Sequence, residues 1–225
     1  TVADNMSTDV PSGVVRAYDM TTGERVWAWE ALPPTSPEIT AADGPGVTTV
    51  AMTEHTASLT GNPASTAVQV SVSSEDSGPE FVRGTTNVWS YISVDAQLNL
   101  VYVPTGNTSP DYYGGHRNGS DYFSSSVVAL NGSTGEVVWH FQTVHHDIWD
   151  FDVPSQPTLF DFERDGKIIH GLAQTTKQGY VFLLDRVTGE PLFPVHEKPV
   201  PQSTVAGDFT APTQPVPERP RSLFE

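Results

Sequence analysis

The sequence predicts an all-β protein, a partial β-propeller of three to four blades, from three observations. One eleven-residue turn motif occurs three times, its copies are spaced at about the length of a propeller blade, and no segment has a convincing helical period. Eighteen glycines and nineteen prolines in 225 residues add many turn signals. A β-sandwich with similar hairpins is the alternative, but a sandwich does not predict a fixed repeat period.

The repeated motif predicts a β-hairpin at each copy. Its copies read AYDMTTGERVW from Ala17, ALNGSTGEVVW from Ala129 and LLDRVTGEPLF from Leu183. The Asp or Asn starts a turn, the Gly takes a positive φ, and the aromatic residue falls on the next strand. The flanking strands are expected at 14–18 and 25–29, at 126–130 and 137–142, and at 180–184 and 192–193.

The spacing of the motif predicts propeller blades. Trp139 and Phe193, which end the last two copies, lie 54 residues apart. This suits one four-stranded blade, which takes about 40–50 residues. Trp27 and Trp139 lie 112 residues apart, which corresponds to two blades or to one blade with a large insertion. Further strands are expected at 99–103, 158–160 and 168–173.

Two segments fall outside the repeat. Residues 30–86 are expected to carry an insertion, because 26–82 contains no Lys or Arg and is rich in Ser, Thr, Ala and Gly. Residues 194–225 contain seven prolines and are expected to form an extended connection rather than a set of strands.

Charge and composition exclude several classes of partner. The chain has 27 acidic and 11 basic residues and a formal net charge of −16, so a phosphate backbone would be repelled and nucleic acid is not expected to bind. No apolar run reaches the roughly 18 residues that a membrane-spanning helix needs. Cysteine is absent, which removes disulfides, thiolate metal sites and cysteine nucleophiles.

The stretch HHDIWDFD, residues 145–152, concentrates three carboxylates, two imidazoles and an indole in the loop after the strand that ends near Gln142. A carboxylate beside an indole is partly desolvated, which keeps it basic enough to accept a proton. His145 and His146 are adjacent and point to opposite sides of an extended chain, so they are poor joint metal ligands. A polar turn that caps strands is the alternative role for this loop.

The sequence, with its repeated hairpins and the HHDIWDFD loop, resembles the quinoprotein dehydrogenases that use pyrroloquinoline quinone (PQQ), especially the membrane-bound glucose and quinate dehydrogenase branch. The resemblance covers 3–27, resumes at TNVWSY from Thr86, and continues nearly to the end. TVHHDIWDFDVPSQPTL, KQGYVFLLDRVTGE and EKPVPQ are its most specific parts. It implies that residues 1–225 are a fragment of one PQQ-binding, eight-bladed propeller whose hairpins are tryptophan-docking motifs.

The resemblance assigns roles to three residues. Asp150 matches the catalytic base that removes the hydroxyl proton of the substrate. Lys177, in TTKQG, matches the basic residue that contacts the quinone oxygens of PQQ, and Trp89 matches the tryptophan on which the planar cofactor stacks. Asp147 and Asp152 are expected to be turn and supporting carboxylates.

The family's cofactor works with a bound Ca²⁺ or Mg²⁺, which prefers carboxylate and amide oxygens. By resemblance the ligands are Asp4 and Asn5 of ADN and Asn107 of PTGN. The glucose branch uses a Thr about two places after this Asn, where the chain has Ser. The loop ligand is therefore open between Asn107, the first choice, Thr108 and Ser109, with Thr105 as a secondary candidate.

The resemblance implies an enzyme that oxidises a sugar or polyol hydroxyl with PQQ, with the glucose type favoured and quinate, shikimate or simple alcohols as alternatives. Electrons are expected to pass to a membrane quinone at the periplasmic side of the bacterial inner membrane, with any membrane anchor outside this fragment. The isolated fragment is expected to be inactive, because a partial ring leaves sheet edges unpaired. A non-catalytic propeller scaffold is the competing class, but it gives no reason to keep Trp89, Asp150, Lys177 and a set of oxygen ligands together.

Overall fold

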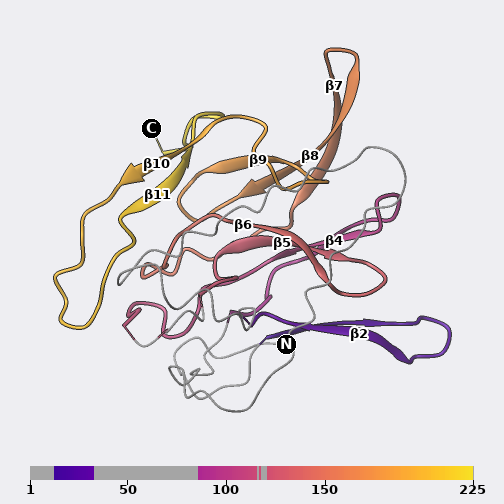
Figure 1. Ribbon diagram of the computed structural model, residues 1–225, viewed down its shortest axis with the longest axis horizontal. Coiled ribbons are helices and arrows are strands. Elements are labelled where there is room, and N and C mark those ends of the chain that lie inside the picture. The colour runs from indigo at the N-terminus through magenta and orange to yellow at the C-terminus, as the bar shows by residue number, and fades with distance from the viewer. Residues whose placement is uncertain (1–12, 33–85, 116, 118–120, 225) are drawn as a thin grey trace, which may run out of the picture.

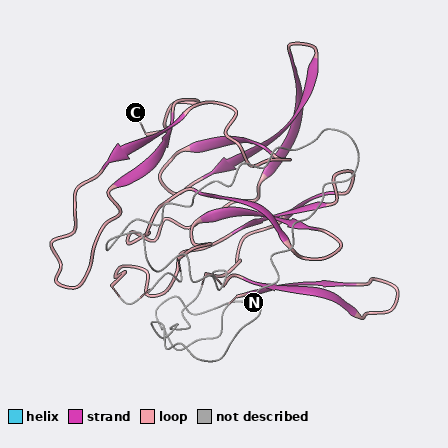
Figure 2. Ribbon diagram, viewed as in Figure 1, coloured by secondary structure: helices cyan, strands magenta, loops and turns pink. Residues whose placement is uncertain are grey.

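The computed structural model describes residues 13–32, 86–115, 117 and 121–224. All regular structure in these residues is β, with strands β1 to β11 in four antiparallel sheets and no helix, which confirms the all-β prediction (Figures 1 and 2). Within these ranges no helix has the length and apolar character that crossing a membrane requires. Asp4, Asn5 and most of the predicted insertion at 30–86 lie outside the described residues.

The predicted turn chemistry is present in all three copies of the motif. In each copy the side-chain oxygen of the first turn residue accepts the backbone N–H groups two and three positions ahead, at 2.8–3.1 Å. The motif glycine has a φ between 74° and 80°, where an L side chain is strained. The accepting residues are Asp19, Asn131 and Asp185, and the glycines are Gly23, Gly135 and Gly189.

The first two hairpins form as predicted. The first turn joins β1 (Val14–Tyr18) to β2 (Arg25–Glu30), which make a two-stranded sheet. The second joins β5 to β6 within a four-stranded sheet of order β3-β4-β5-β6, which is a complete propeller blade. The strands of this blade are β3 (Ser93–Asp95), β4 (Leu100–Pro104), β5 (Ser126–Asn131) and β6 (Val137–Gln142).

The third hairpin is only partly formed. Strands β7 (Thr158–Arg164), β8 (Lys167–Thr175) and β9 (Val181–Asp185) make a three-stranded sheet, and the β7–β8 hairpin extends beyond β9 as an arm (Figure 1). The strand predicted at 192–193 is wrong, because only a single bridge, Leu184 to Pro191, follows the turn. Prolines on both sides of 192–193 have no N–H to continue a ladder.

The proline-rich segment also departs from the prediction. Strands β10 (Val195–Pro199) and β11 (Thr213–Pro217) pair as an antiparallel ribbon, so an extended connection without strands is wrong for this part of 194–225. The register explains how prolines fit. The three prolines within the strands all fall on one alternate set of pairs: Val195–Pro217, Glu197–Pro215 and Pro199–Thr213.

The other set of β10–β11 pairs carries the hydrogen bonds. Just beyond the strand ends, Val200 N donates to Pro212 O at 3.3 Å and Glu218 N donates to Pro194 O at 2.9 Å. Antiparallel pairs alternate between hydrogen-bonded and non-hydrogen-bonded positions. The strand prolines therefore occupy the positions at which the ladder needs no N–H.

Successive sheets are joined by tryptophan contacts. Trp27, from β2, donates its Nε1–H to Gly132 O at 2.8 Å, and a Cβ placed on Gly135 would lie 2.7 Å from its ring. Trp139, from β6, repeats this contact on the next copy, with Nε1 3.2 Å from Arg186 O and its ring 2.7 Å from a Cβ on Gly189. The aromatic end of one motif therefore packs on the turn of the following motif, as the docking prediction requires.

The core lies between these sheets, in two clusters of buried apolar side chains. One cluster joins the first sheet to the four-stranded sheet, and the other joins the four-stranded sheet to the three-stranded sheet. Strands β4 and β5 contribute to both and are buried along nearly their whole length, because neighbouring sheets cover both of their faces. The largest fully buried apolar side chains are Tyr102, Phe182, Leu130, Leu172 and Leu184.

We predict that Gly135→Ala destabilises the protein more than a matched substitution without the tryptophan contact. Positive φ alone costs an L residue about 1–2 kcal/mol, and the added methyl must also displace the Trp27 ring. Gly166→Ala is the control, because Gly166 has a φ of 73° and nothing within 4 Å of its would-be Cβ. The unfolding midpoint in urea, followed by tryptophan fluorescence, measures both. Equal losses in the two variants would contradict the docking contact.

Candidate functional site

The chemically active residues lie in loops that follow strands β4, β6 and β8. Strands β4 and β6 run in the same direction, because β5 lies antiparallel between them, so the loops after them leave the same edge of the sheet. Residues 105–109 follow β4, residues 143–152 follow β6, and residues 176–178 follow β8. A backbone bond from Val153 N to Thr105 O, 3.1 Å, ties the first two loops together.

Asp147 organises the 143–152 loop. Its carboxylate is fully buried and accepts bonds from Ser125 Oγ at 2.7 Å, Trp149 N at 2.9 Å and Phe151 N at 2.8 Å. The pKa of Asp147 is raised above its usual value, because the effect of burial exceeds the opposing effect of these hydrogen bonds. The loop wraps around this carboxylate and holds Asp150 at a φ of 60°. The predicted turn role of Asp147 is confirmed.

Asp150 and Lys177, predicted from distant parts of the chain, are in contact. Lys177 Nζ lies 3.1 Å from Asp150 Oδ2 and 2.9 Å from the backbone oxygen of Asp150. It lies closer still, at 2.6 Å, to Oδ2 of Asp152. The Asp152 side chain is 5% exposed, against 25% for Asp150 and 32% for Lys177. Asp150 is therefore the carboxylate that can reach a substrate.

The electrostatics of the pair suit a base beside a permanent cation. Burial and the charge of Asp152 raise the pKa of Asp150, and the hydrogen bond from Lys177 only partly offsets this. Burial alone would lower the pKa of Lys177, but its hydrogen bonds to Asp152 and Asp150 raise it. Lys177 thus stays charged, while Asp150 holds a proton more readily than an exposed carboxylate does.

A further carboxylate, Asp111, lies in the same electrostatic environment and was not singled out from the sequence. Burial and then the charges of Asp150 and Asp152 raise its pKa to about 6. Among the described residues, its buried Oδ1 has no hydrogen-bond partner. Its position four residues after Asn107, in the predicted cofactor loop, was the available signal. A buried carboxylate without a donor is a group that a cation would stabilise.

Trp89 lies beside the same group of residues. Its Nε1 would be 3.2 Å from a Cβ on Gly106, and Asp152 Oδ1 would be 2.9 Å from the same point. The next residue, Ser90, is tied to the segment after the 143–152 loop by a 3.0 Å bond to Pro154 O. Trp89 as a whole residue is 47% exposed, so it is accessible to a planar ligand. The structure therefore brings Trp89, Lys177 and Asp150 to one place.

Asn107 is at the site but its side chain faces inward. The amide is fully buried, its Nδ2 donates to Asp111 O at 3.0 Å, and its Oδ1 accepts bonds from Thr108 N and Ser124 Oγ at 2.8 and 3.2 Å. A metal ion bound to Asn107 Oδ1 would have to displace Thr108 N or Ser124 Oγ, or share the oxygen with them. The role of Asn107 as a metal ligand stays a prediction.

The other candidate ligands of this loop are also buried. Thr105 Oγ1 donates to Phe123 O at 2.6 Å, and Thr108 Oγ1 lies 2.9 Å from Thr86 Oγ1. Ser109 is 3% exposed. In the part of the chain that the structure describes, no three His, Asp or Glu side chains are gathered as a metal site.

The two adjacent histidines contact different residues, but the chain here is not extended as predicted, because His146 has a φ of 43°. His145 contacts Gln142 Oε1 at 2.7 Å and Glu197 Oε1 at 3.1 Å. His146 Nδ1 lies 2.7 Å from Asp121 Oδ2, and its ring stacks on Phe209 at 3.7 Å. Both imidazoles therefore attach the 143–152 loop to its surroundings and do not form a joint metal site.

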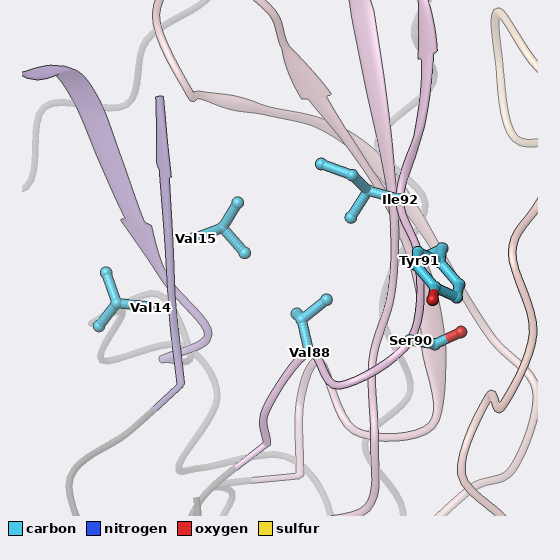
Figure 3. Close-up of a pocket in the computed structure, with 6 residues that line it drawn as sticks. All are labelled: Val14, Val15, Val88, Ser90, Tyr91 and Ile92. Atoms are coloured by element: carbon cyan, nitrogen blue, oxygen red, sulfur yellow. The ribbon is translucent and has the colours of Figure 1, made fainter. Parts of the chain in front are cut away.

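A cavity of about 280 Å³ lies between β1 and the segment that precedes β3, and neither Asp150 nor Lys177 lines it (Figure 3). Val14 and Val15 line one side, and residues on both sides of Trp89 in the chain complete the lining. The wall is mostly aliphatic and contains no ionisable group except the Tyr91 hydroxyl. This cavity is not the site defined by Asp150 and Lys177. Its remaining lining residues are Val88, Ser90, Tyr91 and Ile92.

Sheets linked by tryptophan–glycine contacts, with a carboxylate, an ammonium and an indole at the strand ends, define a propeller of the quinoprotein dehydrogenase class. The profile of the PQQ-dependent glucose/ethanol/alcohol dehydrogenase β-propeller domain matches residues 1–225, and the chain belongs to this family.

Two curated relatives illustrate the range of the family. The chain is 38% identical over 217 residues to the quinoprotein glucose dehydrogenase of Gluconobacter oxydans, covering 96% of this chain and 23% of the relative. It is 36% identical over 216 residues to the quinate/shikimate dehydrogenase (quinone) of Acinetobacter baylyi, covering 95% of this chain and 22% of the relative. The chain thus spans under a quarter of the length of these relatives.

A solved structure supports the fold. The quinohemoprotein alcohol dehydrogenase of Pseudomonas putida superposes with a TM-score of 0.55 at 26% identity, over 84% of this chain and 25% of that chain. The partial-propeller prediction is therefore confirmed by the strands, by the family match and by this comparison.

We predict that Gly106→Ala weakens binding of PQQ to the full-length protein about tenfold or more. The added methyl would lie 2.9 Å from Asp152 Oδ1 and 3.2 Å from Trp89 Nε1, so it must displace two groups of the site. Gly171→Ala is the control, because its methyl would meet Phe160, away from the site. Spectroscopic titration of the apoprotein with PQQ measures the affinity. An unchanged affinity in Gly106→Ala would show that this arrangement does not bind the cofactor.

Proposed function

We propose that the protein containing this chain is a PQQ-dependent dehydrogenase that oxidises a hydroxyl group of a sugar or polyol, with glucose as the first candidate substrate. The observation that carries the proposal is the contact of Lys177 with Asp150 and Asp152, together with the position of Trp89 Nε1 near Asp152 at Gly106. Asp150, Lys177 and Trp89 come from separate loops of a chain that matches the family along its whole length. A scaffold would not need this combination.

Asp150 is proposed as the base. Its carboxylate is partly exposed and has a raised pKa, so it can accept the proton of a substrate hydroxyl. PQQ, when bound, supplies the quinone that accepts the hydride. Lys177 holds a positive charge beside the base, where it can stabilise negative charge that develops on a bound oxygen. Trp89 offers an indole surface for a planar ring.

We also propose that a divalent cation, Ca²⁺ or Mg²⁺, binds at this site. Burial and the charges of Asp150 and Asp152 raise the pKa of Asp111, and its buried Oδ1, which has no hydrogen-bond partner among the described residues, is an available hard donor. We retain Asp4, Asn5 and Asn107 as the proposed ligands. A cation bound by them would offset the negative charge of the carboxylates at the site. Asp111 is a carboxylate that such a cation would stabilise.

Glucose is proposed first because the sequence motifs resemble the glucose branch, and a glucose dehydrogenase matches at 38% identity. A glycerol dehydrogenase large subunit at 38% and a probable quinate dehydrogenase (quinone) at 39% match as well, so identity does not rank these substrates. The quinate/shikimate relative, at 36%, keeps that alternative open. Its name specifies a quinone, which supports our proposal that electrons pass to a membrane quinone. We further propose that the site faces the periplasm, and that the 225 residues alone are inactive.

Turnover by the full-length protein tests this proposal. Apoprotein is loaded with PQQ and either Ca²⁺ or Mg²⁺, and dye reduction is followed with glucose, quinate, glycerol and ethanol. We expect the highest kcat/KM with glucose. A higher value with quinate or ethanol would contradict the glucose assignment, and failure to bind PQQ or to oxidise any of the four would favour a scaffold.

The variant Asp150→Asn tests the role of Asp150 in the same assay. It removes the base but preserves the shape of the side chain, so we expect PQQ to bind within about twofold of wild type. General base catalysis is typically worth about 10²–10⁴-fold, and kcat should fall by that order. Wild-type kcat in Asp150→Asn would exclude Asp150 as the base.

A further inference from the structure

Lys177 uses every hydrogen bond that its side chain can donate. An ammonium group has three N–H donors. In this structure they are matched by Asp152 Oδ2, by the backbone oxygen of Asp150 and by Asp150 Oδ2. A ligand oxygen can therefore bind Lys177 through a hydrogen bond only if one of these three acceptors is released.

The three bonds differ in a way that indicates which one is exchanged. The bond to Asp152 is the shortest, at 2.6 Å, and its carboxylate is the least exposed. The bond to the Asp150 side chain is the longest, at 3.1 Å, and its carboxylate is five times more exposed, at 25% against 5%. The Asp150 side chain is thus the acceptor that is easiest to displace.

Asp152 is itself held in place from a second direction. Its Oδ1 accepts the backbone N–H of Asn107 at 2.5 Å, while its Oδ2 accepts Lys177. The carboxylate therefore links the loop after β4, the loop after β6 and the start of the loop after β8. Both oxygens act as acceptors, so an amide in this position would leave one of the two donors facing an NH₂ group.

We propose that Asp152 is the positioning residue for Lys177. It keeps the ammonium fixed at the junction of the three loops, and the Asp150 Oδ2 bond is exchanged for an oxygen of the bound cofactor. The exchange frees the carboxylate of Asp150 to receive a substrate proton. The inference rests on the proposed function for the identity of the ligand, but the anchoring of Lys177 is a property of the protein without ligand.

Amine labelling of the full-length apoprotein tests the anchoring without any turnover. Lys167, Lys177 and Lys198 are the only lysines of this chain, so mass spectrometry can follow each of them during acetylation. We expect Lys177 to react at least about tenfold more slowly than Lys167 in the wild type. Asp152→Asn should remove most of this difference. Glu163→Gln, which changes an exposed carboxylate on β7, should leave it intact.

A double-mutant cycle on PQQ affinity separates positioning from a general structural role. Asp152→Asn should weaken PQQ binding about tenfold in the wild-type background and should add almost nothing in a Lys177→Met background, because the residue through which it acts is already absent. Equal losses in both backgrounds would show that Asp152 acts independently of Lys177 and would overturn the proposal.

Two further outcomes keep the proposal separable from the function. If the wild type does not bind PQQ, the proposed function fails, whereas the labelling experiment still decides whether Asp152 anchors Lys177. If Asp152→Asn does not fold, Asp152→Glu replaces it, because it retains both acceptors on a longer stem. In Asp152→Glu, Lys177 should be acetylated faster than in the wild type, and a wild-type rate of acetylation would overturn the proposal.

Discussion

The contact between a tryptophan and the glycine turn of the next motif is the constraint on which the rest of the structure depends. Only glycine satisfies both requirements of the turn, since its φ is positive and a Cβ would occupy the position of the indole ring. The same geometry recurs at Trp27 and Trp139, so it fixes the relation between successive sheets twice. The loops that leave these sheets can then meet with the precision that a binding site needs.

The site concentrates charge and backbone strain on this rigid support. Two acidic side chains, Asp150 and Asp152, contact the ammonium of Lys177, and their charges also act on Asp111. Positive φ values occur nearby in the chain at Ser125, His146 and Asp150. Partly buried like charges and strained residues cost stability, and both persist in proteins mainly where function requires them. The Trp–Gly contacts and the buried strands β4 and β5 supply the rigidity that holds these residues in place.

The sequence predicted those features that depend on short-range chemistry. The T-G-E turns specify hairpins locally, and the family motifs specify Trp89, Asp150 and Lys177. It could not predict β10 and β11, because proline content indicates an extended chain, and only the register shows that the prolines avoid the hydrogen-bonded pairs. It also could not show which of three neighbouring carboxylates binds Lys177 most closely, since that depends on a loop wrapped around Asp147.

The most direct measurement is an experimental structure of the full-length protein with PQQ bound. We expect the planar cofactor to lie against the indole of Trp89, and Lys177 Nζ to donate to a cofactor oxygen while it keeps its bond to Asp152. PQQ bound away from these side chains would rule out this binding site, and a Lys177 that has left Asp152 to reach PQQ would rule out the anchoring role of Asp152.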